Sequence, residues 1–159
     1  MSDLMENREG WSTANCSIAR ALEVVGTRAA VLILREAFFG TRRFDDFARR
    51  VGISEPVAAA RLKELTAAGV LERVPYQEPG QRTRFEYQLT EKGRALQPVI
   101  TALRQWGDAW GADPAGPPVV AVHRDCGAAV GVRVRCDAGH DVAAGQIEYQ
   151  PGSGLVFAS

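Results

Sequence analysis

Apolar positions recur at helical spacing along the first half of the chain, and single glycines separate the periodic segments. The spacing predicts short helices over residues 18–25 and 44–51 and a longer one over 28–39, each followed directly by a glycine that can end it. The 28–39 segment is apolar around most of its circumference, which is typical of a helix buried at the centre of a small helical core.

A fourth helix is predicted after the tight turn Gly52-Ile53-Ser54. Ser54 is a good N-cap, and Pro56 falls in the first turn, where its missing N–H costs nothing. The helix should run to Ala68, with Gly69 ending it. Its inward positions, spaced i, i+4 and i+7, are Ala58, Leu62 and Leu65.

The period then changes from 3.6 to 2, which predicts two strands over residues 70–76 and 85–89. The polar segment between them, 77–84, contains Pro79-Gly80 and is typical of a hairpin loop. A continuous helix is expected from the cap at Thr90 to about Trp110. Its apolar stripe comprises Leu96, Val99, Ile100, Leu103, Trp106 and Trp110.

Helices followed by a two-stranded hairpin and a last helix are the order of a winged helix-turn-helix. The expected fold is therefore mainly α with a β-hairpin wing (α+β), carrying a small β-rich C-terminal appendage. We divide the chain into a flexible N-terminal arm (1–15), a DNA-binding and dimerisation domain (16–112), a linker (113–118) and a β-rich tail (119–159). A short helix and a tight turn of this kind present the next helix to the major groove.

The charge pattern adds modest support for a nucleic-acid partner. The chain has 19 Lys and Arg against 19 Asp and Glu, so the net charge is zero. Residues 40–84 nevertheless hold nine basic residues against six acidic ones. Such an excess suits a phosphate-facing surface but is equally typical of a solvated face.

The candidate DNA-binding residues fall on three segments. On the fourth helix they are Ser54, Pro56, Ala59, Ala60, Arg61 and Lys63; before the third helix they are Arg42 and Arg43; and in the wing they are Gln81, Arg82, Thr83 and Arg84. Any single cation among them could instead be a solubilising surface charge. The run Ala58-Ala59-Ala60 offers methyl groups but no hydrogen bonds, so DNA shape should matter more than direct base readout.

Several separated motifs, in the right order and spacing, resemble the HxlR-type regulators, which are relatives of the MarR family. They include Cys16-x-x-x-Arg20-Ala21-Leu22, Gly40-x-Arg42-Arg43-Phe44, Gly52-Ile53-Ser54, Arg61-Leu62-Lys63-Glu64-Leu65 and Thr90-Glu91-Lys92-Gly93. The match covers about residues 16–110. The resemblance implies a bacterial transcription regulator that works as a homodimer, with its terminal helices in the dimer interface. The sequence departs from the family at Ala29 or Ala30, where relatives usually carry tryptophan.

Cys16 precedes a helix whose N-terminus would favour a thiolate, and Arg20 follows one turn later. In the resembling family, a cysteine at this place is a redox sensor in some members and has no known sensing role in others. Both a sensing role and an inert packing role therefore stay open.

A second group of residues has zinc-ligand character. His123-x-x-Cys126 and Cys136-x-x-x-His140 are two pairs of the kind that tetrahedral zinc requires. The second pair lacks Cys-x-x-Cys spacing, since Gly139 stands where the second cysteine would be expected. A zinc-ribbon-like tail and a metal-free β-rich tail that packs on the dimer are the two interpretations.

Catalysis and membrane insertion are not expected. Both histidines lie in the tail, so a nucleophile–histidine site cannot be built from residues 1–112. The sequence also has no phosphate-binding loop, which would indicate a nucleotide-binding enzyme. With no long apolar run and no signal peptide, a cytoplasmic location is predicted. The last helix should serve the core or the dimer interface, and it could also line an effector pocket. The alternative function is a winged-helix protein-docking module without DNA binding.

Overall fold

The structure is a computed structural model that describes residues 8–80 and 82–157. Its elements are η1 (Thr13–Asn15), α2 (Ser17–Val25), α3 (Arg28–Phe38), α4 (Phe44–Val51), α5 (Glu55–Ala67), β1 (Leu71–Tyr76), β2 (Arg84–Leu89), α6 (Glu91–Arg94), α7 (Gln97–Trp110) and η2 (Ala144–Gln146). The chain divides into two compact units, Val24–Val132 and Met1–Glu23 with Arg133–Ser159. No helix in the described part is long and apolar enough to cross a membrane.

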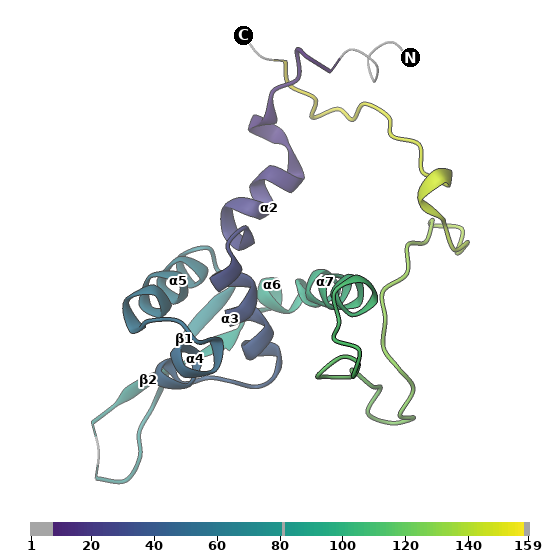
Figure 1. The fold of residues 1–159 in the computed structure, drawn as a ribbon. Coiled ribbons are helices and arrows are strands. Elements are labelled where there is room, and N and C mark those ends of the chain that lie inside the picture. Colours follow the sequence, from purple (N-terminus) through teal and green to yellow (C-terminus); the bar gives the residue numbers. More distant parts are fainter. Residues whose placement is uncertain (1–7, 81, 158–159) are drawn as a thin grey trace. The chain divides into compact units, whose positions relative to one another are not determined.

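The core of the larger unit lies where α3, α4 and α5 meet the start of the hairpin (Figure 1). Its fully buried large side chains are Ile33, Leu34, Phe47, Leu62, Leu65, Val70 and Leu71. The predicted inward stripe of the fourth helix is confirmed, because Ala58, Leu62 and Leu65 are all buried. The central position predicted for the 28–39 helix is confirmed at Ile33 and Leu34, whereas Phe39, just beyond α3, is 53% exposed.

Local capping explains where these helices begin and end. The Thr27 hydroxyl accepts a hydrogen bond from the backbone N–H of Ala30 at 3.1 Å, which satisfies a free donor of the first turn of α3. Gly52 ends α4 with φ of 70°, in the left-handed region that a side chain would disfavour. Both the four-helix order and these boundaries match the sequence prediction to within one or two residues.

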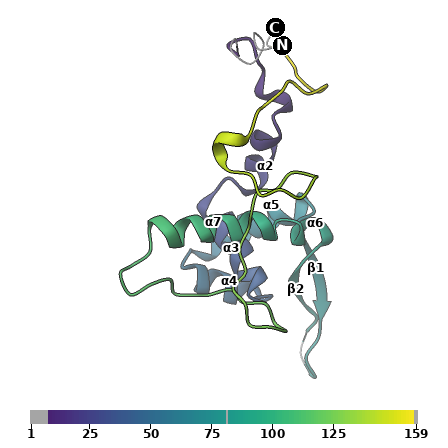
Figure 2. The same ribbon diagram turned by 90° about the vertical axis from the view of Figure 1, so that its right-hand side faces the viewer.

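The two strands pair antiparallel, from Leu71 opposite Leu89 to Tyr76 opposite Arg84. The hairpin projects from the helices as a wing, which both views show (Figures 1 and 2). Its base is fixed to the helical body, because the backbone N–H of Tyr87 donates to the carbonyl of Arg42 at 2.8 Å. The Tyr87 ring also meets Phe47 edge to face, with 6.2 Å between centroids. The predicted winged helix-turn-helix is confirmed.

The single long helix expected from Thr90 to Trp110 is wrong, because the segment forms α6 and α7 with a break at Ala95 and Leu96. Pro98 lies in the first turn of α7. Proline lacks the N–H that would bond the carbonyl of Arg94, so the helix cannot run through this point and restarts instead.

Strands are also absent from the described part of the tail. Residues 119–157 hold isolated β-bridges, such as Val122 with Ala129 and Arg135 with Asp141, and the short 3-10 helix η2. Single bridges form where glycine-rich turns bring two residues together, but the glycines do not supply the side-chain packing that would extend a ladder. In the N-terminal arm, Thr13–Asn15 form a 3-10 turn and Trp11 bridges to Phe157.

Candidate nucleic-acid interface

α5 is set on the helical body by its short connection to α4. The N–H groups of Gly52 and Ile53 both donate to the carbonyl of Ala48, at 3.0 and 3.1 Å. Ile53, which is half-buried between the two helices in the chain, packs against the core cluster. These contacts fix the direction in which α5 leaves α4, as a helix-turn-helix requires.

The N-cap and the outward face of α5 carry five of the six DNA-binding residues that the sequence predicts on this helix. Ser54, Pro56, Ala59, Ala60 and Lys63 are all exposed. Ser54 occupies the N-cap position, yet its side chain makes no capping hydrogen bond. The N–H groups of the first turn therefore keep their donor capacity and can bind a phosphate oxygen. Glu55, also exposed in this turn, opposes such an anion.

Arg61 differs from the other members of this set. Its side chain is only 29% exposed, and its Nη1 atom lies 2.6 Å from the Glu64 carboxylate one turn later. Arg61 must leave this ion pair, or share it, to reach DNA. Val57 is an outward residue that the sequence analysis missed: it is 43% exposed and lies three residues after Ser54. An exposed methyl-bearing side chain at this position can contact thymine methyl groups.

The wing presents unpaired positive charge. Arg82, Thr83 and Arg84 are exposed, and within residues 8–80 and 82–157 no carboxylate lies within ion-pair distance of either arginine. Gln81, the fourth predicted wing residue, lies outside the described residues. A further cation, Arg73, stacks on the Phe85 ring across the hairpin, 4.2 Å from its centroid. This contact covers part of an exposed aromatic and keeps a cation on the strand.

Arg42 and Arg43 are both engaged in ion pairs with the wing. Nη1 of Arg42 lies 3.2 Å from the carboxylate of Glu86, and Nη2 of Arg43 lies 2.7 Å from that of Glu78. The Arg43 guanidinium also stacks over Tyr76, 4.7 Å from the ring centroid. The hydrogen bond to Glu78 raises the pKa of Arg43 above its ordinary value, because it stabilises the charged guanidinium. The sequence analysis placed both arginines near DNA but did not foresee these partners.

Cys16 lies in the smaller unit as a half-buried free thiol just before α2. It lines a cavity of about 650 Å³ whose walls also include Trp11, Tyr149 and Leu155. The carbonyl of Cys16 accepts a hydrogen bond from the backbone N–H of Arg20 at 3.0 Å, as the first bond of the helix. Redox sensing by Cys16 stays a prediction.

The four predicted zinc ligands form two separate contacts. Nδ1 of His123 lies 3.2 Å from Sγ of Cys126, and Sγ of Cys136 lies 3.5 Å from Nδ1 of His140. The first pair belongs to the larger unit and the second to the smaller one. Among the residues that the structure describes, no three His, Cys, Asp or Glu side chains gather as a metal site would require. Zinc binding by these four residues stays a prediction.

Comparison with known proteins gives consistent relatives. The model of the HxlR-like helix-turn-helix family matches residues 24–114. An uncharacterized HTH-type transcriptional regulator of Mycobacterium tuberculosis, Rv3095, is 43% identical over 156 residues, which cover 98% of this chain and 94% of that protein.

Solved structures agree with this likeness. PA1607, described as a proposed transcription factor, is 36% identical and superposes with a TM-score of 0.78, covering 92% of this chain and 99% of that one. The redox regulator HypR in its oxidized form is 29% identical, with a TM-score of 0.55 over 62% of this chain and 99% of that one.

Proposed function

This chain belongs to the HxlR-like helix-turn-helix family of transcriptional regulators, and we propose that it binds a palindromic operator as a homodimer. In this proposal, α5 enters the major groove and the wing lies against the adjacent backbone or minor groove. Two recognition helices related by a two-fold axis would contact half-sites about one helical turn apart. Neither operator binding nor homodimer formation requires a catalytic residue.

The observation that carries the DNA part is the unpaired charge at the wing tip. Arg82 and Arg84 are exposed on a hairpin whose base is fixed to the helical body through Tyr87. Lys63 adds an exposed cation on the outward face of α5. Because these side chains are not in ion pairs with protein carboxylates, they can replace the counterions of DNA phosphates without breaking an existing contact.

The decisive experiment measures duplex binding as a function of salt. Replacement of Arg82 and Arg84 together by alanine should weaken binding to every duplex, including one of random sequence. The slope of log affinity against log salt should fall by roughly 0.9 for each phosphate contact that is lost, which is close to 2 in all. Fluorescence anisotropy with a labelled random duplex at several salt concentrations provides both quantities.

A matched control removes two exposed arginines elsewhere, Arg20 and Arg124, and so changes the net charge equally. This variant should keep both the affinity and most of the slope. Equal losses in the two variants would attribute the effect to overall charge. Binding by the unaltered chain that does not respond to salt would contradict the DNA proposal and favour a protein-docking module.

The homodimer part rests on the apolar surface of α7. Val99, Leu103, Trp106 and Trp110 are 46%, 50%, 69% and 78% exposed in the single chain. A stripe of large apolar side chains in contact with water marks an interaction surface. If two copies of α7 pack together about a two-fold axis, the apolar stripe of each copy is buried against the other.

Control of the regulator is proposed to come from a small-molecule effector or from oxidation of Cys16. Mass spectrometry after mild peroxide treatment, together with the DNA affinity of Cys16→Ser, separates a sensor from a packing residue. A sensor loses DNA affinity on oxidation only when Cys16 is present. Because chromosomal DNA is its partner, we assign the protein to the bacterial cytoplasm.

A further inference from the structure

The tail holds both histidines of the protein and two of its three cysteines, arranged as two pairs. In each pair the imidazole and the thiol are in direct contact. Nδ1 of His123 lies 3.2 Å from Sγ of Cys126, and Nδ1 of His140 lies 3.5 Å from Sγ of Cys136. Both cysteines are exposed free thiols, so a ligand from solution can reach them.

A tight backbone turn holds each pair together. The N–H of Gly127 donates to the carbonyl of His123 at 2.8 Å, and the N–H of Gly139 donates to the carbonyl of Cys136 at 2.8 Å. Both glycines have positive φ, 70° and 83°, a conformation that other residues rarely adopt. Backbone geometry therefore sets the spacing of the two side chains in each pair.

The separations within the pairs match those of two ligands on one zinc ion. Zinc lies about 2.3 Å from a thiolate sulfur and about 2.0 Å from an imidazole nitrogen, so two such ligands at the tetrahedral angle are about 3.5 Å apart. The observed contacts of 3.2 and 3.5 Å are close to this value. Each pair can therefore form one edge of a zinc tetrahedron with little rearrangement.

Asp125 gives the first pair a second feature of metal sites. Its carboxylate lies 3.7 Å from Nε2 of His123, the ring nitrogen that does not face Cys126. A metal-ligating histidine commonly donates its other N–H to a carboxylate, which fixes the tautomer and the ring orientation. In that tautomer, the lone pair of Nδ1 is available to a metal on the side of the thiol.

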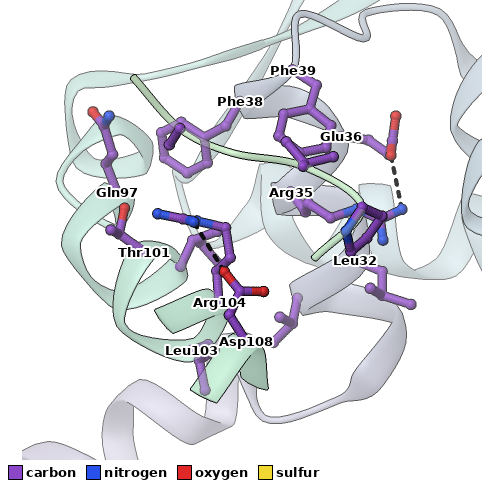
Figure 3. Close-up of a pocket in the computed structure, with 15 residues that line it drawn as sticks. Leu32, Arg35, Glu36, Phe38, Phe39, Gln97, Thr101, Leu103, Arg104 and Asp108 are labelled. Carbon is purple, nitrogen blue, oxygen red and sulfur yellow. Dashed lines mark hydrogen bonds and ion pairs between the residues drawn. The ribbon is translucent and has the colours of Figure 1, made fainter. Parts of the chain in front are cut away.

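The turn that carries the first pair is anchored to α7. Nη2 of Arg104 donates to the carbonyl of Val130 at 2.9 Å, and the N–H of Val132 donates to Oε1 of Gln105 at 2.9 Å. Nη1 of Arg104 is itself held by Asp108 at 3.1 Å, as Figure 3 shows. A ligand pair on an anchored turn loses less conformational freedom on binding a metal than a pair on a free chain does.

Apolar packing contributes little to the order of the tail. Val120, Val122 and Val134 are 63%, 55% and 57% exposed, and the described tail residues pair only through isolated bridges. Small segments that bury so little apolar surface are often ordered by a structural metal, whose binding energy then serves as folding energy.

We propose that the tail binds one zinc ion through the two pairs, with His123, Cys126, Cys136 and His140 as its four ligands. Among the described residues no three such side chains already gather, so the site is completed when zinc binds, as in other segments whose folding is coupled to a metal. Two thiolates and two imidazoles select zinc over magnesium or calcium, which prefer oxygen ligands.

The test measures metal binding by the full chain without DNA, so its outcome is separate from that of the DNA proposal. Protein purified without chelator, or supplemented with zinc and desalted, should contain one zinc per chain by elemental analysis. Titration of the chelator-treated chain with Co²⁺ should give the visible absorption of tetrahedral coordination and a thiolate charge-transfer band. Less than about 0.1 zinc per chain in both preparations would overturn the proposal and leave a thiol–imidazole hydrogen bond in each pair.

Serine variants show whether both pairs bind the same ion. Cys126→Ser and Cys136→Ser each remove one ligand at an exposed position, and each should lose the stoichiometric zinc and the cobalt spectrum. Both should keep the far-ultraviolet circular dichroism of the unaltered chain, because the α-helices all precede the tail. Cys16→Ser removes the third cysteine and should retain one zinc. Retention of one zinc by either tail variant would overturn the four-ligand site.

A second comparison tests the position of Asp125. Asp125→Asn should weaken zinc binding about tenfold, as loss of a carboxylate partner does at other histidine ligands, with one zinc per chain still bound at saturation. Competition with a colorimetric chelator measures the affinity. Asp137→Asn removes the same charge beside Cys136, from an exposed residue without an ion pair among those described, and should weaken binding less. Equal losses in the two variants would contradict the orienting role of Asp125.

Discussion

Arg43 and Glu78 join the start of α4 to the loop of the wing, with 2.7 Å between Nη2 and the carboxylate oxygen. Arg43 is the N-cap residue of α4, and Glu78 follows the end of β1. The same arginine is a predicted phosphate ligand, so the Glu78 carboxylate and a DNA phosphate compete for one guanidinium. The pair is exposed, with side chains 50% and 42% accessible, and its strength is accordingly small.

Replacement of Glu78 by glutamine should therefore strengthen DNA binding. The change removes one negative charge near the duplex and frees Arg43, so a several-fold rise in affinity at low salt is expected, with a steeper salt dependence. Stability should change by less than about 1 kcal/mol, as for other exposed ion pairs. Anisotropy titrations of a random duplex measure the effect. Weaker binding by Glu78→Gln would mean that the carboxylate acts mainly to position the wing.

The buried hydrogen bond between Thr41 and Glu36 should contribute more to the free energy of unfolding than the exposed Arg43–Glu78 pair does. Glu36 and Thr41 are 6% and 5% exposed, and the Thr41 hydroxyl donates to Glu36 while it accepts from Arg50 at 3.2 Å. Thr41→Val keeps a similar shape but leaves Glu36 without this donor in a nearly dry site. The expected loss is about 1–3 kcal/mol of unfolding free energy, measured by urea denaturation. Thr83→Val, at an exposed wing position, should change it by less than about 0.5 kcal/mol.

The apolar face of α7 provides a test of the dimer. Trp106→Glu with Trp110→Glu would place two charges in the proposed interface, where they lack partners and cannot be desolvated cheaply. Sedimentation velocity should then give the mass of one chain, while the unaltered protein gives that of two. The control, Val120→Glu with Tyr149→Glu, adds the same charge at exposed apolar positions outside α7 and should stay dimeric. An unaltered protein that sediments as a monomer would contradict the homodimer.

Most of the fold could be predicted because its signals are local. Thr27 and Gly52 act within one turn of the residues they cap or stop, and the alternation in the two strands is visible without any partner. The break between α6 and α7 also had a local signal in Pro98, which the continuous apolar stripe obscured.

The electrostatic partners within the candidate interface could not be predicted in this way. Arg42 and Arg43 pair with carboxylates 44 and 35 residues later in the chain. Those contacts form because the hairpin folds back on the start of α4. The hydrophobic periodicity of either segment does not predict that the two lie close together.

Replacement by alanine should change the free energy of unfolding in opposite directions at two helical glycines, Gly93 and Gly107. A Cβ atom on Gly93 would come within 2.1 Å of the carbonyl oxygen of Val70, so α6 cannot keep its place against the start of β1. The N–H and hydroxyl of Thr90 bond the carbonyls of Val70 and Gly69 at the same junction, at 3.1 and 2.6 Å, and they would be displaced together. Gly93→Ala should therefore lower the unfolding free energy by several kcal/mol, on the order of other overpacked sites.

Gly107, within α7, is the matched case, because a Cβ atom there meets nothing within 4 Å. Alanine is favoured over glycine inside a helix by about 1 kcal/mol, so Gly107→Ala should stabilise the protein by up to that amount. Urea denaturation of both variants, with an unchanged dependence on denaturant, makes the comparison. Similar midpoints for the two would show that α6 is not seated against Val70 in solution, because the close approach is the only feature that separates their expected behaviour.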